Sequence, residues 1–224
     1  DGVGRVMLSY CQSLEAQGHR ALYIAPNNPL YPEQVKCETL LYDGIRIPGE
    51  PYRVGIPRLS KSFRNATCHL KFDLVHAHSP FLAGREARRL ARRDNAPLVA
   101  TFHSKYYDDF YKATHSKTLA NAGVQYAVDF YNTCDEVWAV NEKTADVLRG
   151  YGYAGTIIPM CNGTTPPTLT AREREAAALR FPLRDNVPTL IFAGMQNKKK
   201  NTESVIRACA HLKNQGMDFQ LLMV

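Results

Sequence analysis

The sequence predicts an α/β protein built on a parallel sheet, with a second domain of the same kind beginning near its C-terminal end. Short apolar runs alternate with segments of helical periodicity, and several of the runs are apolar throughout, which is typical of parallel strands covered by helices on both faces. The composition agrees, because 45% of the residues are hydrophobic and 28 Lys and Arg stand against 21 Asp and Glu. These values suit a soluble globular protein of one or two domains and exclude the disordered classes.

The chain opens on Asp1-Gly2-Val3-Gly4, and a helical pattern follows that stops at Gly18. Glycines at a helix start leave backbone N–H groups and the positive end of the helix dipole open to a diphosphate. Gly2 and Gly4 are therefore candidate phosphate-binding residues. The alternative interpretation is that they only allow a helix to pack closely on a sheet.

Five strands are predicted next along the chain, separated by helices. They cover residues 20–25, 74–78, 98–103, 136–141 and 156–159, while residues 27–57 are predicted to be rich in turns. Ligands of parallel sheets gather at the carboxyl ends of the strands, where His78 and His103 lie. We interpret His76 as a buried, hydrogen-bonded residue. The His-x-His pattern is taken to place its two rings on opposite faces of the strand, so that they do not share a metal ion.

The composition changes after the last of these strands, at a Pro-rich and Thr-rich segment. We predict a first domain over residues 1–160, a crossover over 161–187 and the start of a second domain over 188–224. Thr170 is placed to cap a helix that runs to Arg180. The second domain is expected to hold a strand at 189–194, a helix at 202–212 and a strand at 219–224.

Five arginines recur at helical spacing between the second and third strands, and we call them the arginine stripe. They are Arg85, Arg88, Arg89, Arg92 and Arg93. Such a stripe can dock on an anionic membrane surface, at roughly 1 kcal/mol for each arginine. An ordinary solvated helix face is the alternative. A nucleic-acid partner is not expected, because no aromatic interleaving or binding module accompanies the stripe.

The cysteines are scattered and form no C-x-x-C pair, which favours reduced thiols over a disulfide framework and predicts no metal site. No secretory leader and no apolar run long enough to cross a bilayer are present in the sequence.

The order of several short motifs resembles that of the retaining glycosyltransferases of family 4, which have the GT-B fold and include bacterial lipid and polysaccharide glycosyltransferases. The motifs are Gly2-Val3-Gly4-Arg5, Asp73-Leu74-Val75-His76-Ala77-His78-Ser79-Pro80, Thr101-Phe102-His103, Val137-Trp138-Ala139-Val140-Asn141, Ile158-Pro159 with Asn162-Gly163, and Phe192-Ala193-Gly194 with Lys200-Asn201. The resemblance implies a Rossmann-like acceptor-side domain over 1–160 and a Rossmann-like nucleotide-sugar domain beginning at 188. It also implies transfer of a hexose from a nucleotide diphosphate sugar to a hydroxyl of a lipid, glycan or small molecule.

The resemblance assigns roles to individual residues. His103 would be catalytic and would face the transferred sugar or the acceptor hydroxyl, while Gly2, Gly4 and Lys200 would bind the donor diphosphate. The loop after His103 is polar, and we expect it to line an acceptor cleft with His78, Tyr106 and Tyr107. No cofactor is expected beside the UDP- or GDP-sugar substrate, and no metal. A cytoplasmic location follows, peripheral at the inner face of the membrane if the arginine stripe docks there.

Two features depart from the family pattern. Met195 stands where the family usually has an arginine, so that diphosphate binding would rest on Lys200 with help from Lys198 or Lys199. The family's Glu-x7-Glu motif would lie beyond residue 224, and the first strand of its N-terminal sheet would precede residue 1. We therefore expect a fragment that is inactive by itself, with a gap at the centre of its sheet and low stability.

Two alternatives remain open from the sequence. One is a non-catalytic module that binds a sugar phosphate or an anionic membrane, which Met195 favours. The other is a GT-B sugar-nucleotide epimerase, which would need carboxylates and histidines of its own in the cleft.

Overall fold

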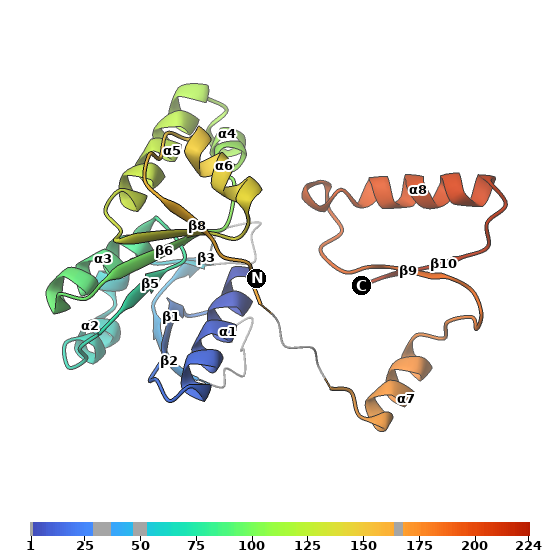
Figure 1. Cartoon of the computed structure of the whole chain (residues 1–224), viewed down its shortest axis with the longest axis horizontal. Helices are drawn as coiled ribbons and strands as arrows, with labels where there is room; N and C mark the ends of the chain where they lie inside the picture. The colour runs from blue at the N-terminus through green and yellow to red at the C-terminus, as the bar shows by residue number, and fades with distance from the viewer. Residues whose placement is uncertain (1, 29–36, 47–52, 164–167) are drawn as a thin grey trace. The chain divides into compact units, whose positions relative to one another are not determined.

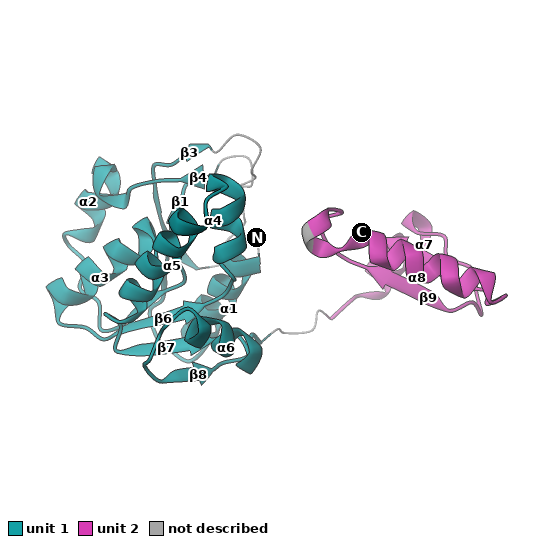
Figure 2. Cartoon of the chain, turned by 90° about the horizontal axis from the view of Figure 1, so that it is seen from above, with its two compact units in different colours: residues 1–164 teal, residues 165–224 magenta. Residues whose placement is uncertain are grey.

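In the computed structural model the chain forms two compact units, Asp1–Thr164 and Thr165–Val224 (Figure 2). The structure describes residues 2–28, 37–46, 53–163 and 168–224, and each unit is considered by itself. The prediction from the sequence was that the first domain ends at residue 160 and that residues 161–187 form a crossover. In the structure the helix at 171–180 clusters with the second unit.

The centre of the first unit is a parallel sheet of four strands in the order β5-β6-β7-β8 (Figure 1). Their bounds are Val75–Ala77 for β5, Leu98–Phe102 for β6, Glu136–Ala139 for β7 and Ile157–Pro159 for β8. All five residues of β6 are buried, because this strand has a neighbour on each side and helices over its faces. The predicted α/β class with a parallel sheet is confirmed, and the predicted strands are each within a few residues of those observed.

Helices cover this sheet. They are α3 (Leu82–Asp94), α4 (Tyr107–Thr114), α5 (Lys117–Tyr131) and α6 (Glu142–Gly150). Two of these helices begin at a capping residue. The side chains of Ser116 and Asn141 accept hydrogen bonds from backbone N–H groups in the first turns of α5 and α6. Buried Phe102, Tyr131 and Leu148 are among the largest side chains in the core that the helices form with the sheet.

The described residues between 27 and 57 include strands that the prediction of a turn-rich segment did not contain. This stretch contains β2 (Glu38–Tyr42), β3 (Ile45–Arg46) and β4 (Arg53–Val54), and is followed by the 3-10 turn η1 (Pro57–Leu59) and α2 (Lys61–Thr67). Residues 29–36 and 47–52 lie outside the described part of the chain. Strand β2 pairs in parallel with β1 (Leu22–Pro26), and its Tyr42 packs on Phe63 of α2 in a second, smaller core.

The β1-β2 pair and the four-stranded sheet are separate ladders in the described residues. Helix α1 (Gly2–Ala16) contacts β1, and its Tyr10 ring lies 5.5 Å from the His76 ring of β5. One helix therefore touches both ladders. No helix in the described ranges is long and apolar enough to span a membrane.

The second unit has one βαβ element. The βαβ element consists of β9 (Thr189–Phe192), α8 (Thr202–Asn214) and β10 (Gln220–Met223). Helix α7 (Ala171–Arg180) precedes it, and the 3-10 turn η2 (Lys198–Lys200) lies between β9 and α8. Strands β9 and β10 pair in parallel. Thr170 caps α7 as predicted and forms a reciprocal capping box with Glu173.

Candidate functional site

The structure brings His78 and His103 together at one edge of the four-stranded sheet. Each follows the carboxyl end of its strand, β5 or β6, and these strands are parallel neighbours in which His76 pairs with Val99 and Ala77 with Ala100. The register pairs residues 23 positions apart, so His103 lies two residues beyond the position opposite His78 and projects to the same face, where His78 Nδ1 lies 2.8 Å from His103 Nε2. The two rings are stacked at a centroid distance of 5.1 Å.

His76 joins the same cluster, and the prediction that its ring and that of His78 occupy opposite faces is wrong. The two ring centroids are 4.1 Å apart. Alternate residues of a strand project to one face, so an i, i+2 pair shares a face. His76 is half-buried, and it has the expected hydrogen bond, because its Nε2 lies 2.7 Å from Thr101 Oγ1.

Two aromatic rings pack against the cluster and contribute to its burial. Tyr10 lies 5.9 Å from His78, and the Trp138 ring of β7 lies 4.9 Å from His76, both measured between ring centroids. Burial therefore lowers the pKa of His103 to about 4 and that of His76 to about 4. The pKa of His78 falls further below its usual range, because burial is reinforced by the neighbouring imidazoles His76 and His103.

All three imidazoles are consequently neutral at pH 7. One proton lies between His78 Nδ1 and His103 Nε2, and whichever ring carries it donates to the other. If His78 donates, His103 carries its own proton on Nδ1 and can donate from there; if His103 donates, its Nδ1 is an acceptor. In both cases Nδ1 of His103 is the nitrogen left for a ligand.

This burial predicts acid lability. Each of the three histidines has its pKa lowered on folding, so below pH 6.5 the unfolded chain binds more protons than the folded one, and stability falls as the pH drops from about 6.5 towards about 4. We expect the free energy of unfolding to decrease by at least about 1 kcal/mol per pH unit in this window. Urea titrations followed by circular dichroism at several pH values measure it, and the slope should be smaller in His103→Gln. A stability that is flat between pH 6.5 and 4.5 would contradict the burial of the cluster.

Tyr106 and Tyr107, which the sequence predicts to line an acceptor cleft, both pack against the core cluster of the first unit. Tyr106 packs against the core, its hydroxyl lies 3.3 Å from that of Tyr131, and burial raises its pKa to about 12, so its position is that of a packing residue. Tyr107 is half-buried, its backbone N–H donates to Tyr151 Oη at 3.2 Å, and its ring stacks on that of Tyr111. Of the predicted cleft residues, His78 is the one in contact with His103.

The predicted diphosphate residues fall in both units. Gly2 and Gly4 lie in the first turn of α1, and a Cβ added to Gly2 would meet no atom within 4 Å. Lys200 ends η2 in the second unit, where its side chain is exposed and its backbone N–H donates to Asn197 Oδ1 at 3.0 Å. Among the described residues, no group of three or more His, Cys, Asp or Glu side chains is placed to hold a metal ion.

A sequence model described as Glycosyltransferase Family 4 matches residues 1–164, which is most of the chain and includes the whole histidine cluster. The chain belongs to glycosyltransferase family 4. It is 27% identical over 159 residues to a GDP-mannose-dependent alpha-mannosyltransferase of Corynebacterium glutamicum, covering 68% of this chain and 37% of the relative. It is also 27% identical over 230 residues to an alpha-monoglucosyldiacylglycerol synthase of Acholeplasma laidlawii, covering 92% of this chain and 55% of the relative.

A likeness to a solved structure supports the GT-B fold of this family 4 chain. The crystal structure of Anabaena Alr3699/HepE in complex with UDP-glucose superposes with a TM-score of 0.50 over 97% of this chain and 65% of that one, at 14% identity. The chain thus spans about a third to about half of the length of the curated relatives named here.

Sequence reasoning located His103 and His78 in this family 4 chain but missed the side chains that set their chemistry. Thr101 lies in a buried strand, and Tyr10 lies in an amphipathic helix where its position carries no local signal of contact with a histidine. The contacts arise from tertiary packing. The alternation of β6 could have indicated Thr101, because it lies two residues before His103 and so shares its face.

Proposed function

We propose that this protein is a retaining glycosyltransferase that moves a hexose from a nucleotide diphosphate sugar to an acceptor hydroxyl. The observation that best supports the proposal is the neutral His103, held through Nε2 by His78 at the carboxyl edge of the parallel sheet in a family 4 chain. That edge is where ligands of such sheets bind.

In the proposed reaction His103 acts through Nδ1. As a donor it would hold a hydroxyl or the ring oxygen of the transferred sugar, and as an acceptor it would take a hydrogen bond from the attacking hydroxyl. His78 would act as a positioning residue, because its bond to Nε2 fixes the ring plane of His103 and links its tautomer to that of its neighbour. A buried, preorganised group of this kind stabilises a transition state without reorganising during the reaction.

The leaving nucleoside diphosphate gains negative charge as the glycosidic bond breaks, and we assign its stabilisation to two groups. The first is the start of α1, where Gly2 has no Cβ to crowd a phosphate and the backbone N–H groups of a helix start can bind phosphate oxygens. The second is the ammonium of Lys200, presented by a turn that Asn197 caps. Both would interact more strongly with the transition state than with the bound donor.

The donor is proposed as a UDP- or GDP-sugar, since the names of the relatives and of the structural neighbour include one of each nucleotide. The acceptor is proposed as a hydroxyl of a lipid, a glycan or a small molecule, and no cofactor is assigned. We place the protein in the cytoplasm, at the inner face of the membrane where the acceptor is a lipid.

A donor panel tests the proposal. The full-length protein is incubated with UDP- and GDP-sugars and with diacylglycerol or soluble glycan acceptors, and we expect sugar transfer from one nucleotide class, with the anomeric configuration of the donor kept in the product by NMR. Inversion would contradict the retaining mechanism. A converted sugar nucleotide without an acceptor product would indicate an epimerase, and no turnover of any donor by a folded protein would favour a binding module.

A further inference from the structure

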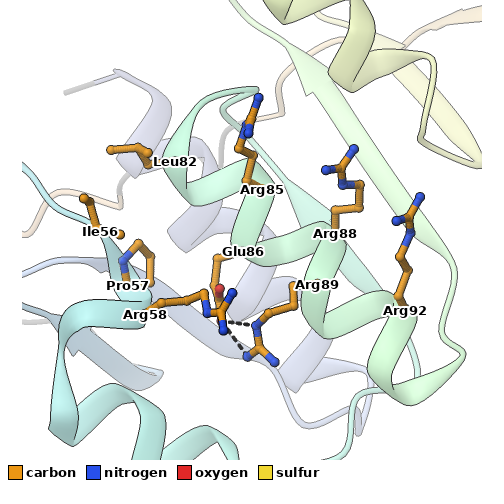
Figure 3. Close-up of a pocket in the computed structure, with 9 residues that line it drawn as sticks. All are labelled: Ile56, Pro57, Arg58, Leu82, Arg85, Glu86, Arg88, Arg89 and Arg92. Atoms are coloured by element: carbon orange, nitrogen blue, oxygen red, sulfur yellow. Dashed lines mark hydrogen bonds and ion pairs between the residues drawn. The ribbon is translucent and has the colours of Figure 1, made fainter.

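The arginine stripe faces a hollow of about 420 Å³ on the first unit, between η1 and α3 (Figure 3). Four of its arginines line the hollow together with Arg58 of η1, and Glu86 of α3 is paired with Arg89 at 2.6 Å. None of the lining residues belongs to the histidine cluster. Docking of the stripe on an anionic membrane stays a prediction from the sequence.

A second feature outside the proposed reaction is a pair of thiols on α1 and next to β2. Cys11 is a buried residue of α1, and Cys37 is half-buried and immediately precedes Glu38, the first residue of β2. The two cysteines are 26 positions apart in the sequence, but their thiols are joined by a hydrogen bond in the structure. The sequence pattern of scattered cysteines gave no sign of this contact.

Regular structure on both sides brings the two thiols together. Helix α1 contacts β1, and β1 pairs in parallel with β2, where Leu22 lies opposite Glu38. The Glu38 carboxylate accepts two hydrogen bonds of 2.7 Å from the Arg20 guanidinium, which joins the residue after Cys37 to the chain just before β1. Since the thiols are already in contact, little movement is needed to bring the two sulfur atoms to bonding distance.

The two thiols differ in accessibility and in acidity. Burial raises the pKa of Cys11 to about 12. Burial raises the pKa of Cys37 as well, but the hydrogen bond that it receives from Cys11 opposes this rise. Because the thiolate is the nucleophile in thiol oxidation, the more accessible Cys37 is the thiol that reacts first, and Cys11 is placed to react with the product.

We propose that Cys11 and Cys37 are a reversible oxidation site, at which hydrogen peroxide forms a disulfide that fastens α1 to the β1-β2 pair. The Cys37 thiolate attacks the O–O bond of the peroxide, which leaves a sulfenic acid on Cys37 and releases a hydroxide that takes up the proton lost by Cys37. Cys11 then attacks that sulfur, so that the S–S bond forms, the S–O bond breaks and the oxygen leaves as water with the proton of Cys11. One peroxide is reduced to two waters while two thiols are oxidised, and a thiol reductant reverses the oxidation by exchange.

The disulfide would restrain the helix that connects the two parts of the proposed site. Helix α1 has Gly2 and Gly4 in its first turn, and the ring of its Tyr10 lies 5.5 Å from that of His76. In the cytoplasm the thiols would be reduced at rest, because disulfides in reducing compartments are transient. The inference goes beyond the proposed function and does not depend on it, since the disulfide is detected without a donor or turnover.

Peptide mapping of the full-length protein tests the proposal with no nucleotide sugar present. The folded protein is treated with hydrogen peroxide, the remaining thiols are blocked with iodoacetamide, and a tryptic digest is analysed by mass spectrometry without reduction. Trypsin releases the two cysteines in separate peptides, 6–20 and 37–46, so the disulfide appears as one joined species that dithiothreitol separates. We expect this joined species, and a midpoint of thermal unfolding that is raised by about 5 °C or more in the oxidised protein.

The variant Cys37→Ser should remove both the joined species and the rise in the unfolding midpoint. Cys68→Ser is the matched control, because its exposed thiol in the same unit donates to the backbone oxygen of Asn65 at 2.9 Å; this variant should oxidise as the unchanged protein does. Recovery of Cys11 and Cys37 as separate alkylated peptides after peroxide treatment would overturn the proposal. So would an equal yield of the joined species from urea-unfolded protein, because the fold would then not direct the pairing.

Discussion

Replacing His103 with Gln is expected to lower kcat for sugar transfer by about 1000-fold with little change in the fold. The side-chain amide of Gln lies close to where imidazole has Nε2, so the variant keeps a polar atom facing His78 Nδ1, which lies 2.8 Å from Nε2 of the native residue. The variant lacks Nδ1, the ring nitrogen through which we propose that His103 contacts the substrate. The loss should therefore appear in the rate of the chemical step.

Steady-state kinetics of the full-length protein, with circular dichroism to check folding, measure this effect. His78→Asn is the informative companion, because an Asn amide resembles Nδ1 and keeps a partner for His103; it should lose less activity than His103→Gln. His19→Gln, at an exposed position of the same unit, is the control and should behave as the unchanged protein. A His103→Gln variant with more than about a tenth of the native kcat would remove His103 from the proposed catalytic role.

Replacing Lys200 with Ala is expected to lower kcat/KM for the donor by about 100-fold or more, since one cation opposite the leaving diphosphate is lost. The side chain is exposed and ends a turn whose backbone is held by Asn197, so the substitution should not alter folding. Lys200→Arg keeps the charge but not the compact shape of the ammonium and should recover part of the activity.

Lys213→Ala supplies the matched control, because it removes one charge from the exposed last turn of α8. Donor affinity measured by calorimetry with UDP and with GDP separates binding from chemistry. If Lys200→Ala and Lys213→Ala have the same kcat/KM, the diphosphate is held by other groups, and the basic turn is an ordinary solvated surface.

The parts of the fold that the sequence predicted are those with a local signal. β6 reads as a continuous apolar run because all five of its residues are buried, and α7 begins where Thr170 and Glu173 can cap each other. Strand β2 was missed, since three of its five residues are exposed and its apolar run, Leu40-Leu41-Tyr42, is only three residues long. The two-residue period of a strand is enough to predict that the His76 and His78 rings share a face, as they do. The prediction of opposite faces applied that period wrongly.

The site could be predicted only as far as the strand ends. Those ends indicate where His78 and His103 lie, but the bond between them depends on the register of β5 on β6. Contacts between elements distant in sequence carry no signal that a single sequence reveals.

Trp138 is the single tryptophan in the sequence. Its ring packs against the histidine cluster, with its centroid 4.9 Å from that of the His76 ring. The chain therefore has an intrinsic fluorophore next to the proposed site and no other indole to obscure it. Any ligand that reaches His103, or any protonation of its neighbours, can be followed as a change in emission without a label. A titration of this kind would detect an occupied cleft even when no sugar is transferred.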